Sequence, residues 1–406
     1  MTSPFVRRVV LRNYKSIAAC DLELQNLTFF VGANGSGKSN FLDALRLVAD
    51  GLVTPLEHAI RERGGIDDVR RRSTGHPHNF GIRLELTLPG TGQAAVFAFE
   101  VAAKKNGAFE VKEERCTIEG DGPLFEAGPA SYVIKRGEVV KCSLAHPPAA
   151  AADRFFLVSV SGVPEFRPLY EALSSMSFYN LSPRVIREVQ APDPGSRLLR
   201  DGRNLASVLG RIASDAPAAL ERVTAYLAKL APGIEGVQRE PVAHKETLAF
   251  MQTVKGAKHP WKFFAGSMSD GTLRALGVLV ALAQAADPAH PVALVAIEEP
   301  ESAVHPAATG VLLDALLDAA GQTQVMVTSH SPDLLESEEV NDAQIVAVSA
   351  EEGVSVLGPV TEVGRSALRD HLYTAGELLR MSQLEPDERS RALVPEQLDL
   401  FEGFAS

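Results

Sequence analysis

A short glycine-rich segment carries the strongest chemical signal in the sequence. Residues 32–39 read Gly-Ala-Asn-Gly-Ser-Gly-Lys-Ser, which fits the G-x-x-x-x-G-K-[ST] pattern of a phosphate-binding loop. Glycines let consecutive backbone N–H groups turn toward phosphate oxygens, and a helix that follows presents its positive N-terminal end to the same anion. The segment therefore predicts a nucleoside triphosphate site, with ATP and Mg²⁺ as the expected cofactors.

Within this loop, Lys38 would reach the β- and γ-phosphates, and the hydroxyl of Ser39 would hold Mg²⁺. The apolar run 27–31 is typical of a buried strand that enters the loop, and the spacing of apolar residues after Ser39 predicts a helix that leaves it. The alternative is a glycine-rich turn that binds nothing. The other ATP-binding residues that we expect are Asn34, Gly35, Ser36, Gly37 and Asn40.

Two adjacent acids follow a second apolar run. Residues 292–297 are rich in β-branched side chains and end at Glu298 and Glu299, which predicts a central parallel strand that delivers carboxylates to its C-terminal edge. We expect Glu298 to bind Mg²⁺, directly or through water, and Glu299 to polarise the attacking water. The alternative is a solvated acidic cap on the strand.

Two more segments have the composition of ligand sites. Residues 324–328 predict another buried strand, after which His330 could hydrogen-bond a γ-phosphate and sense its loss. Ser269, Asp270 and Gly271 precede a long apolar helix, residues 273–286, and would form a second anion-binding helix N-terminus. Each segment also has a purely structural alternative. His330 could be a structural histidine, and residues 269–271 could be an ordinary helix cap.

The order of these motifs resembles that of the ATP-binding-cassette (ABC) ATPases, in particular the stand-alone RecF-like members of the SMC/RecF/OLD branch. The resemblance implies an α/β fold, a P-loop NTPase of ABC-ATPase type, with a mixed or parallel core sheet, an antiparallel β subdomain and a helical insertion. It also implies catalytic roles for Glu299 and His330. The segments that carry it are residues 11–17, 32–40, 269–274, 298–301, 305–306 and 328–332.

The same resemblance implies an ATP-dependent homodimer. Ser269, Asp270 and Gly271 would be signature residues that complete the site of the opposing subunit, residues 302–305 would link the two sites, and Arg12 would lie near the phosphates. Two positions depart from the family pattern: Glu298 replaces the usual Asp, and Asp270 stands where many cassettes have Gly. No glutamine lies at a convincing position for the glutamine-bearing loop of the family.

The remaining sequence is organised in segments. Alternating apolar and polar residues between 80 and 160 predict an antiparallel sheet, and residues 235–264 predict strands that return to the core. We therefore divide the chain into an N-terminal part of the ATPase head, a helical insertion or lid, a C-terminal part of the head and a flexible tail: residues 1–162, 163–232, 233–384 and 385–406.

The tail carries one further motif. Gln397-Leu398-Asp399-Leu400-Phe401 resembles the pentapeptide with which bacterial proteins bind the sliding clamp. Leu398, Leu400 and Phe401 would fill an apolar groove of the clamp while Gln397 hydrogen-bonds at its edge. The alternative is a terminal segment that folds back onto its own domain.

Composition limits the function further. The 406 residues are 45% hydrophobic and 22% charged, which is enough for a substantial core, and no apolar stretch is long enough to predict a membrane span or membrane partner. Three isolated cysteines and the lack of a secretory signal predict a cytoplasmic protein. The net charge of −11 leaves room for a local basic groove, and the densest positive patch, residues 70–72 with His76 and His78, is a candidate DNA contact or a solvated loop.

Three functions fit these observations. The leading one is a cytoplasmic ABC-type ATPase in DNA repair, replication-coupled maintenance or defence against foreign DNA. The second is an ATPase switch that regulates a separately encoded nuclease or toxin without binding DNA itself. The third, the nucleotide-binding subunit of a membrane transporter, is disfavoured by the long insertion and the RecF-like N-terminus. No D-x-D pair follows Pro332, so we expect no nuclease activity in this chain.

Overall fold

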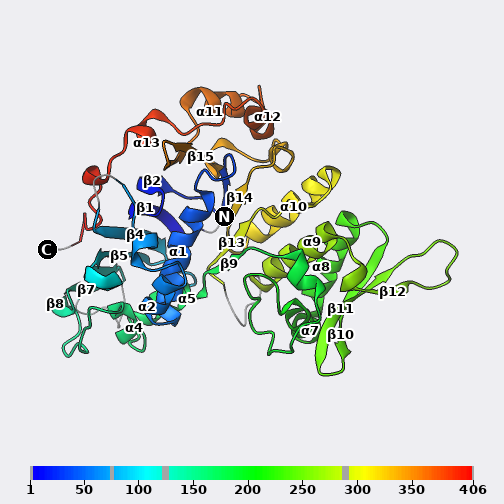
Figure 1. Ribbon diagram of the computed structural model, residues 1–406, viewed down its shortest axis with the longest axis horizontal. Coiled ribbons are helices and arrows are strands. Elements are labelled where there is room, and N and C mark those ends of the chain that lie inside the picture. Colours follow the sequence, from blue (N-terminus) through cyan, green and yellow to red (C-terminus); the bar gives the residue numbers. More distant parts are fainter. Residues whose placement is uncertain (1–2, 74–76, 121–127, 286–291, 405–406) are drawn as a thin grey trace. The chain divides into compact units, whose positions relative to one another are not determined.

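The computed structural model describes residues 3–73, 77–120, 128–285 and 292–404 (Figure 1). The chain divides into two compact units: unit 1 is Met1–Met176, Asn341–Leu372 and Ser382–Ser406, and unit 2 is Ser177–Val340 and Tyr373–Met381. This division differs from the four sequence segments because residues 177–179 form a strand of unit 2, whereas residues 345–359 form strands of unit 1. His76 lies outside the described residues.

Unit 1 is built on a mixed sheet with the strand order β8-β7-β6-β5-β4-β1-β2-β16-β15-β3. The strands from β8 to β2 pair antiparallel, whereas β16 pairs parallel with β2 and β15 pairs parallel with β3. Its elements are β1 (Val6–Tyr14), β2 (Ile17–Glu23), β3 (Leu27–Val31), α1 (Lys38–Val53), α2 (Leu56–Arg61), α3 (Ile66–Val69), β4 (Asn79–Thr87), β5 (Ala94–Ala103), β6 (Phe109–Ile118), β7 (Ala130–Lys135), β8 (Glu138–Cys142), α4 (Phe156–Ser159), α5 (Arg167–Ser175), β15 (Ile345–Glu351), β16 (Val354–Pro359), α11 (Glu362–Arg369) and α13 (Glu388–Ala392).

The antiparallel part of unit 1 confirms the alternation seen in the sequence. Strands β4 to β8 form a continuous meander, in which every pair of neighbours in the chain is also a pair in the sheet. Its inward face is aromatic, because Phe80, Phe97, Phe99 and Phe155 contact one another edge to face or tilted. These rings form one core of unit 1.

Unit 2 contains three parallel strands in the order β14-β13-β9, with α9 packed on β13 and α10 on β14. The strands predicted at 292–297 and 324–328 and the helix predicted at 273–286 are therefore confirmed, with small shifts at their ends. Its elements are β9 (Ser177–Tyr179), α6 (Pro183–Arg187), α7 (Leu205–Asp215), α8 (Pro217–Leu230), β10 (Ile234–Val242), β11 (Lys245–Gln252), β12 (Trp261–Phe264), α9 (Asp270–Ala285), β13 (Leu294–Glu298), α10 (Thr309–Ala320), β14 (Gln324–Ser329) and α12 (Ala375–Arg380).

The strands expected within residues 235–264 are confirmed, but they do not join the sheet that contains β13. Strands β10, β11 and β12 form a separate three-stranded antiparallel sheet. In Figure 1 the connection between β11 and β12 extends away from helices α7, α8 and α9 of the same unit. Alternating apolar residues show that a strand has one buried face, but they do not show which sheet it joins.

The tail is not a flexible peptide. Leu398 and Leu400 are buried in a cluster with Val10 and Ala19, so the segment that resembles a clamp-binding motif folds back onto unit 1. Arg83 donates to the carbonyl oxygens of Leu400, at 3.2 Å, and Glu402, at 2.6 Å. The guanidinium of Arg115 lies 4.9 Å from the ring centre of Phe401. The apolar anchors are thus already used inside unit 1.

Among the described residues, no helix is long and apolar enough to cross a membrane. The α/β class and the mixed sheet with an antiparallel part are confirmed.

Candidate functional site

The candidate site of unit 1 is the loop between β3 and α1. All five residues of β3 are buried, so the strand fixes the start of the loop. Two glycines are required by their surroundings. A Cβ atom on Gly32 would lie 2.0 Å from the carbonyl oxygen of Val348, and one on Gly37 would lie 2.0 Å from Oγ of Ser355. Gly37 also has a φ of 107°, which side chains rarely adopt. This backbone path is therefore available to glycine alone.

The polar groups of the loop fit a bound phosphate. Nζ of Lys38, on a side chain that is almost fully buried, donates to the carbonyl oxygens of Gly32, at 2.7 Å, and Ala33, at 2.9 Å. The hydroxyl of Ser36 is buried and has no hydrogen-bond partner in the described part of the chain. A buried hydroxyl without a partner is costly, and an anionic oxygen above the loop would accept a hydrogen bond from it. Asn34, Gly35 and Ser39 are exposed.

Two serines that sequence reasoning did not assign support this loop. Asn40 donates through Nδ2 to Oγ of Ser16 at 2.6 Å, and Ser16 shares a 2.6 Å hydrogen bond with Ser355. Ser16 lies between β1 and β2, and Ser355 lies on β16, so the contact joins three distant parts of unit 1 beside Gly37. Ser16 falls in the N-terminal segment of the family resemblance, but no local signal marks Ser355.

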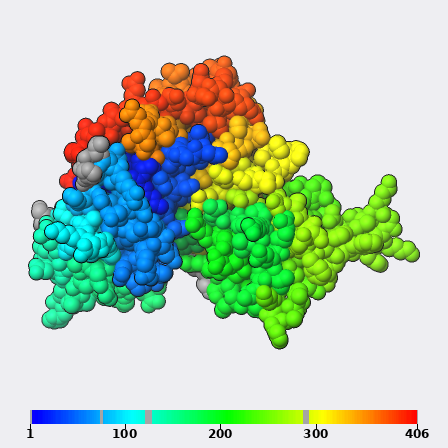
Figure 2. Space-filling model, viewed as in Figure 1, coloured from blue at the N-terminus to red at the C-terminus, as the bar shows by residue number. Residues whose placement is uncertain are grey.

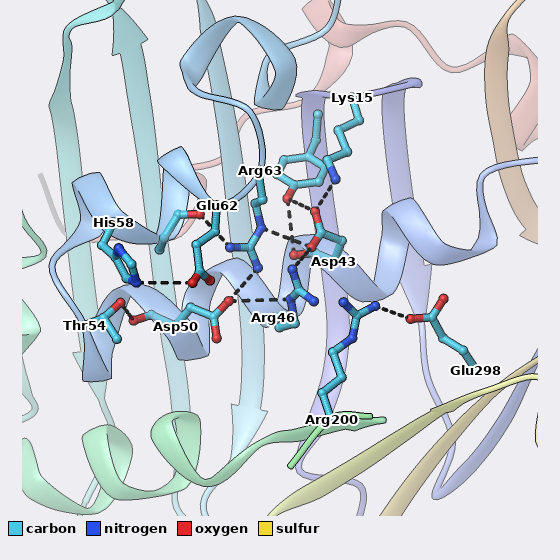
Figure 3. A network of polar contacts seen from close by, with 12 residues as sticks. Lys15, Asp43, Arg46, Asp50, Thr54, His58, Glu62, Arg63, Arg200 and Glu298 are labelled. Carbon is cyan, nitrogen blue, oxygen red and sulfur yellow. Dashed lines mark hydrogen bonds and ion pairs between the residues drawn. The ribbon is translucent and has the colours of Figure 1, made fainter. Parts of the chain in front are cut away.

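The helix behind the loop is anchored by a charged network around Asp43 (Figure 3). The carboxylate of Asp43 meets Lys15 at 2.5 Å, Arg63 at 3.0 Å and Arg46 at 3.0 Å, and the hydroxyl of Tyr14 donates to it at 2.9 Å. Burial alone would raise the pKa of Asp43, but the three cations outweigh it and lower that pKa. The network ties α1 to β1 and to the segment after α2.

Arg12 does not join this loop in the structure. Its guanidinium pairs with Glu100 at 2.6 Å and donates to the carbonyl oxygen of Leu398 at 3.4 Å. The side chain therefore links β1 to β5 and to the tail. A role for Arg12 in ATP binding stays a prediction without support from these contacts.

The predicted basic patch is largely neutralised by its neighbours. Arg70 pairs with Asp67 at 2.8 Å, and Arg72 pairs with Asp68. Both acids lie on the preceding α3. Because each of these two cations has a carboxylate partner, the structure favours the solvated-loop interpretation over a DNA contact.

The candidate site of unit 2 is the C-terminal edge of β13. Glu298 ends the strand, and its Oε1 accepts a hydrogen bond from Nη2 of Arg200 at 2.7 Å (Figure 3). Carboxylate oxygens are ligands that Mg²⁺ prefers, so the chemistry of Glu298 fits the expected metal. Sequence reasoning missed Arg200, which is 98 residues away in the chain.

Glu299 lies next to Glu298 in a strained turn. Its φ is 47°, which is uncommon for a residue with a side chain. Oε1 of Glu299 lies 3.3 Å from Nδ1 of His330, and Ser302 donates to Oε2 at 3.3 Å. The structure thus brings together the acid expected to activate water and the predicted histidine, both of which are partly exposed.

A third acid of this turn is structural. Glu301 is buried and accepts a 2.7 Å hydrogen bond from the hydroxyl of Ser329. Burial raises the pKa of Glu301, and the Ser329 hydrogen bond opposes that shift. The contact fixes the turn after β13 against the end of β14.

Arg274 holds the same turn from the opposite side. From α9, its guanidinium donates to three carbonyl oxygens, those of Leu181 at 2.6 Å, Glu298 at 2.8 Å and Glu299 at 3.0 Å. Burial lowers the pKa of Arg274, while the nearby glutamates act in the opposite direction. An arginine in an otherwise apolar helix was the available sequence signal for this role, which sequence reasoning did not assign.

The predicted signature residues lie at the start of α9 within the same unit. Oγ of Ser269 accepts the backbone N–H of Thr272 at 3.2 Å, and Asp270 pairs with Arg187 at 2.6 Å. A Cβ atom on Gly271 would lie 2.1 Å from the carbonyl oxygen of Ala303. Asp270 therefore forms an ion pair with Arg187 of its own unit. The lack of a side chain at Gly271 allows the loop 302–305 to approach the helix.

Solved structures of SMC heads have a similar fold. The SmcHead bound to the C-winged helix domain of ScpA matches with a TM-score of 0.55 and 15% identity over 87% of this chain and 97% of that chain. The Smc head with an extended coiled coil bound to the C-terminal domain of ScpA, derived from Pyrococcus furiosus, matches with a TM-score of 0.52 and 12% identity over 91% and 99%. Identities this low show the fold alone.

Sequence comparison adds a family. The chain is 36% identical over 89 residues to the DNA replication and repair protein RecF of Gloeobacter violaceus (strain ATCC 29082 / PCC 7421), a match that covers 21% of this chain and 23% of RecF. The chain thus has the fold of an SMC head and a short stretch of similarity to RecF. The model of the AAA domain family whose description names the AbiEii toxin and a type IV TA system matches residues 27–117 and 175–336, and the chain belongs to this family.

Proposed function

We propose that this protein binds and hydrolyses ATP. Lys38 and the loop backbone hold the phosphates, Ser39 and Glu298 supply oxygen ligands to Mg²⁺, and Glu299, held by His330, activates the attacking water. The bound metal would neutralise the charge that develops on the phosphates. The observation that carries the proposal is the loop itself. Its backbone path near Lys38 requires glycine at two positions, and the buried hydroxyl of Ser36 has no hydrogen-bond partner among the described residues.

Nucleotide state would control assembly. Ser269 is exposed at the start of α9, where a hydroxyl and a helix N-terminus are available to an anion from another copy of the chain. In a homodimer, Ser269 and Gly271 of one subunit would thus complete the ATP site of the other. Hydrolysis of the ATP would then separate the two heads. The SMC-like fold supports this interpretation.

The process served is DNA repair, DNA maintenance or defence against foreign DNA. This part of the proposal is supported by the local similarity to a replication and repair protein and by the SMC-head fold. The test is steady-state ATP hydrolysis with and without duplex DNA over a series of salt concentrations, with Lys38→Ala as the blank. Stimulation by DNA that fades as salt rises supports the DNA role, because phosphate contacts are lost with salt. A Lys38-dependent rate that ignores DNA contradicts it.

Dimerisation has its own test. With MgATP, the Glu299→Gln variant should accumulate as a dimer in size-exclusion chromatography with light scattering, because it binds nucleotide but cannot hydrolyse it. The double variant Glu299→Gln/Ser269→Arg should stay monomeric. A monomeric Glu299→Gln protein that has bound ATP would contradict the dimer switch and leave ATP binding intact.

A second candidate is an ATPase switch that controls a separately encoded nuclease or toxin and does not contact DNA. The description of the matched family, which names a toxin of a type IV TA system, favours this candidate. It predicts an ATPase rate that responds to a separately encoded protein partner and not to DNA. The salt-dependent ATPase measurement separates the two candidates.

A further inference from the structure

One hairpin of unit 2 differs in charge from the rest of the chain. We define the basic hairpin as residues 245–264, which comprise β11, the connection 253–260 and β12. The protein has a net charge of −11, yet no Asp or Glu occurs between Glu246 and Asp270. The same stretch contains Lys255, Lys258 and Lys262. In the space-filling view the connection, in yellow-green, stands clear of the helices of its own unit (Figure 2).

The side chains of this hairpin are available to a ligand. Lys255 and Lys258 are exposed and make no ion pair within the part of the chain that the structure describes, whereas Lys262 meets Glu240 of β10 at 3.0 Å. Trp261 is 57% exposed and is the single tryptophan of the chain. Exposed lysines beside an exposed indole ring combine charge for phosphates with a flat face for bases.

We propose that the basic hairpin binds a nucleic acid strand with accessible bases. The ammonium groups of Lys255 and Lys258 pair with backbone phosphates, and the ring of Trp261 stacks on an unpaired base. The inference rests on the DNA role proposed above and deepens it by naming the contact element. An acidic polypeptide would satisfy the lysines as well, but it offers no base for Trp261 to stack on.

The hairpin is also joined directly to the ATPase machinery of its own unit. After β12, a short helical turn, Ala265–Ser267, leads into Ser269 of the signature. A cavity of about 570 Å³ lies at this junction, lined by Gln252 and Phe263 of the hairpin and by Ser269 and Gly271 of the signature. Gln252, which lines the cavity, pairs with Trp261 across the two β-strands. A nucleic acid bound at Trp261 would therefore lie next to a residue of the cavity wall. Binding at the hairpin is thereby positioned to influence the signature turn.

The single tryptophan provides a direct test. Titration of the full chain with an unlabelled oligothymidylate should quench the fluorescence of Trp261 as the base stacks on its ring, and a labelled oligonucleotide should show the same affinity by anisotropy. In the Lys255→Ser/Lys258→Ser variant the slope of log affinity against log salt should fall in magnitude by about 1.4, because two contacts to the phosphates of a single strand are lost. Trp261→Ala should weaken binding without changing that slope.

The matched control is Lys104→Ser/Lys105→Ser, which removes the same charge from the turn between β5 and β6 of unit 1 and should leave binding unchanged. Anisotropy without quenching, or equal binding by the hairpin and control variants, overturns the hairpin site while the DNA role stands. No binding of any oligonucleotide by a protein that still binds ATP overturns both. Equal quenching by polyglutamate assigns the hairpin to an acidic polypeptide and overturns the proposal.

Discussion

The guanidinium of Arg200 lies 2.7 Å from Oε1 of Glu298, the carboxylate that we expect to bind Mg²⁺. The backbone of Arg200 is fixed as well, since its carbonyl oxygen accepts the N–H of Asn180, the residue after β9, at 2.9 Å. A guanidinium and a divalent cation repel each other and use the same carboxylate oxygen. Metal binding through Oε1 of Glu298 therefore requires Arg200 to release this oxygen.

This competition predicts the effect of removing Arg200. In Arg200→Ala, the Mg²⁺ concentration at half-maximal binding of a fluorescent ATP analogue should fall by about 3-fold, the value of a partly exposed ion pair. The control is Arg203→Ala, which removes a nearby arginine that pairs with Asp201 and should leave the Mg²⁺ midpoint unchanged. An unchanged or higher midpoint in Arg200→Ala would contradict the competition.

Gly271→Ala should disable the signature. The added Cβ atom would lie 2.1 Å from the carbonyl oxygen of Ala303, so the loop 302–305 must shift. We expect ATP hydrolysis to fall by about 10- to 100-fold because small displacements of catalytic groups are costly, while ATP binding persists. Gly266→Ala, five residues earlier, is the matched control, since its Cβ would meet no atom within 4 Å. Equal rates in the two variants would remove the claim that this contact sets the turn.

Stability should depend on pH through Glu114 of β6. Burial raises the pKa of Glu114 to about 7 from an ordinary value of 4.5, although its hydrogen bonds from Tyr132, Phe156 and Leu157 oppose the shift. Because the folded pKa is the higher one, the contribution is fully present below about pH 4.5 and is lost as the pH rises through about 7.

The size of this effect follows from the pKa difference. Between pH 4.5 and 8 the free energy of unfolding of the wild type should fall by about 3 kcal/mol relative to Glu114→Gln, whose side chain does not titrate. Urea unfolding of both proteins over this range measures it. Parallel pH profiles of the two proteins would show that Glu114 does not titrate in this window.

The docked tail should contribute to the stability of unit 1. Leu400 is 1% exposed, so Leu400→Ala should lower the free energy of unfolding by about 3 kcal/mol. Val394→Ala, an apolar truncation at an exposed position of the same tail, should change it by less than about 0.5 kcal/mol. Thermal and urea unfolding compare the two. A neutral Leu400→Ala would mean that the tail leaves the sheet readily and is available to another protein.

Local parts of the site could be predicted from sequence because their chemistry is local. The loop 32–39, the acid pair after β13 and the start of α9 each require particular residue types at neighbouring positions, and the strands and helices around them lie where periodicity indicates. Gly32 and Gly37 illustrate this local chemistry. The sequence pattern requires glycine at both positions because the backbone there leaves no room for a side chain.

The contacts that bring distant residues together were not predictable in this way. Ser355 beside Gly37, Arg200 on Glu298 and Arg274 under the acid turn depend on strand order and helix packing, which a single sequence does not contain. The tail failed for a related reason, because Leu398 and Leu400 suit a groove on a partner and the sheet of their own unit equally well.

The central claim is that Glu299 activates the water that hydrolyses ATP held by Lys38. Phosphate release in the presence of MgATP tests this claim most directly. We predict Mg²⁺-dependent release by the wild type and a loss of about 100-fold or more in both Lys38→Ala and Glu299→Gln, with ATP binding lost in Lys38→Ala and retained in Glu299→Gln. Phosphate release at the wild-type rate in both variants would contradict the claim.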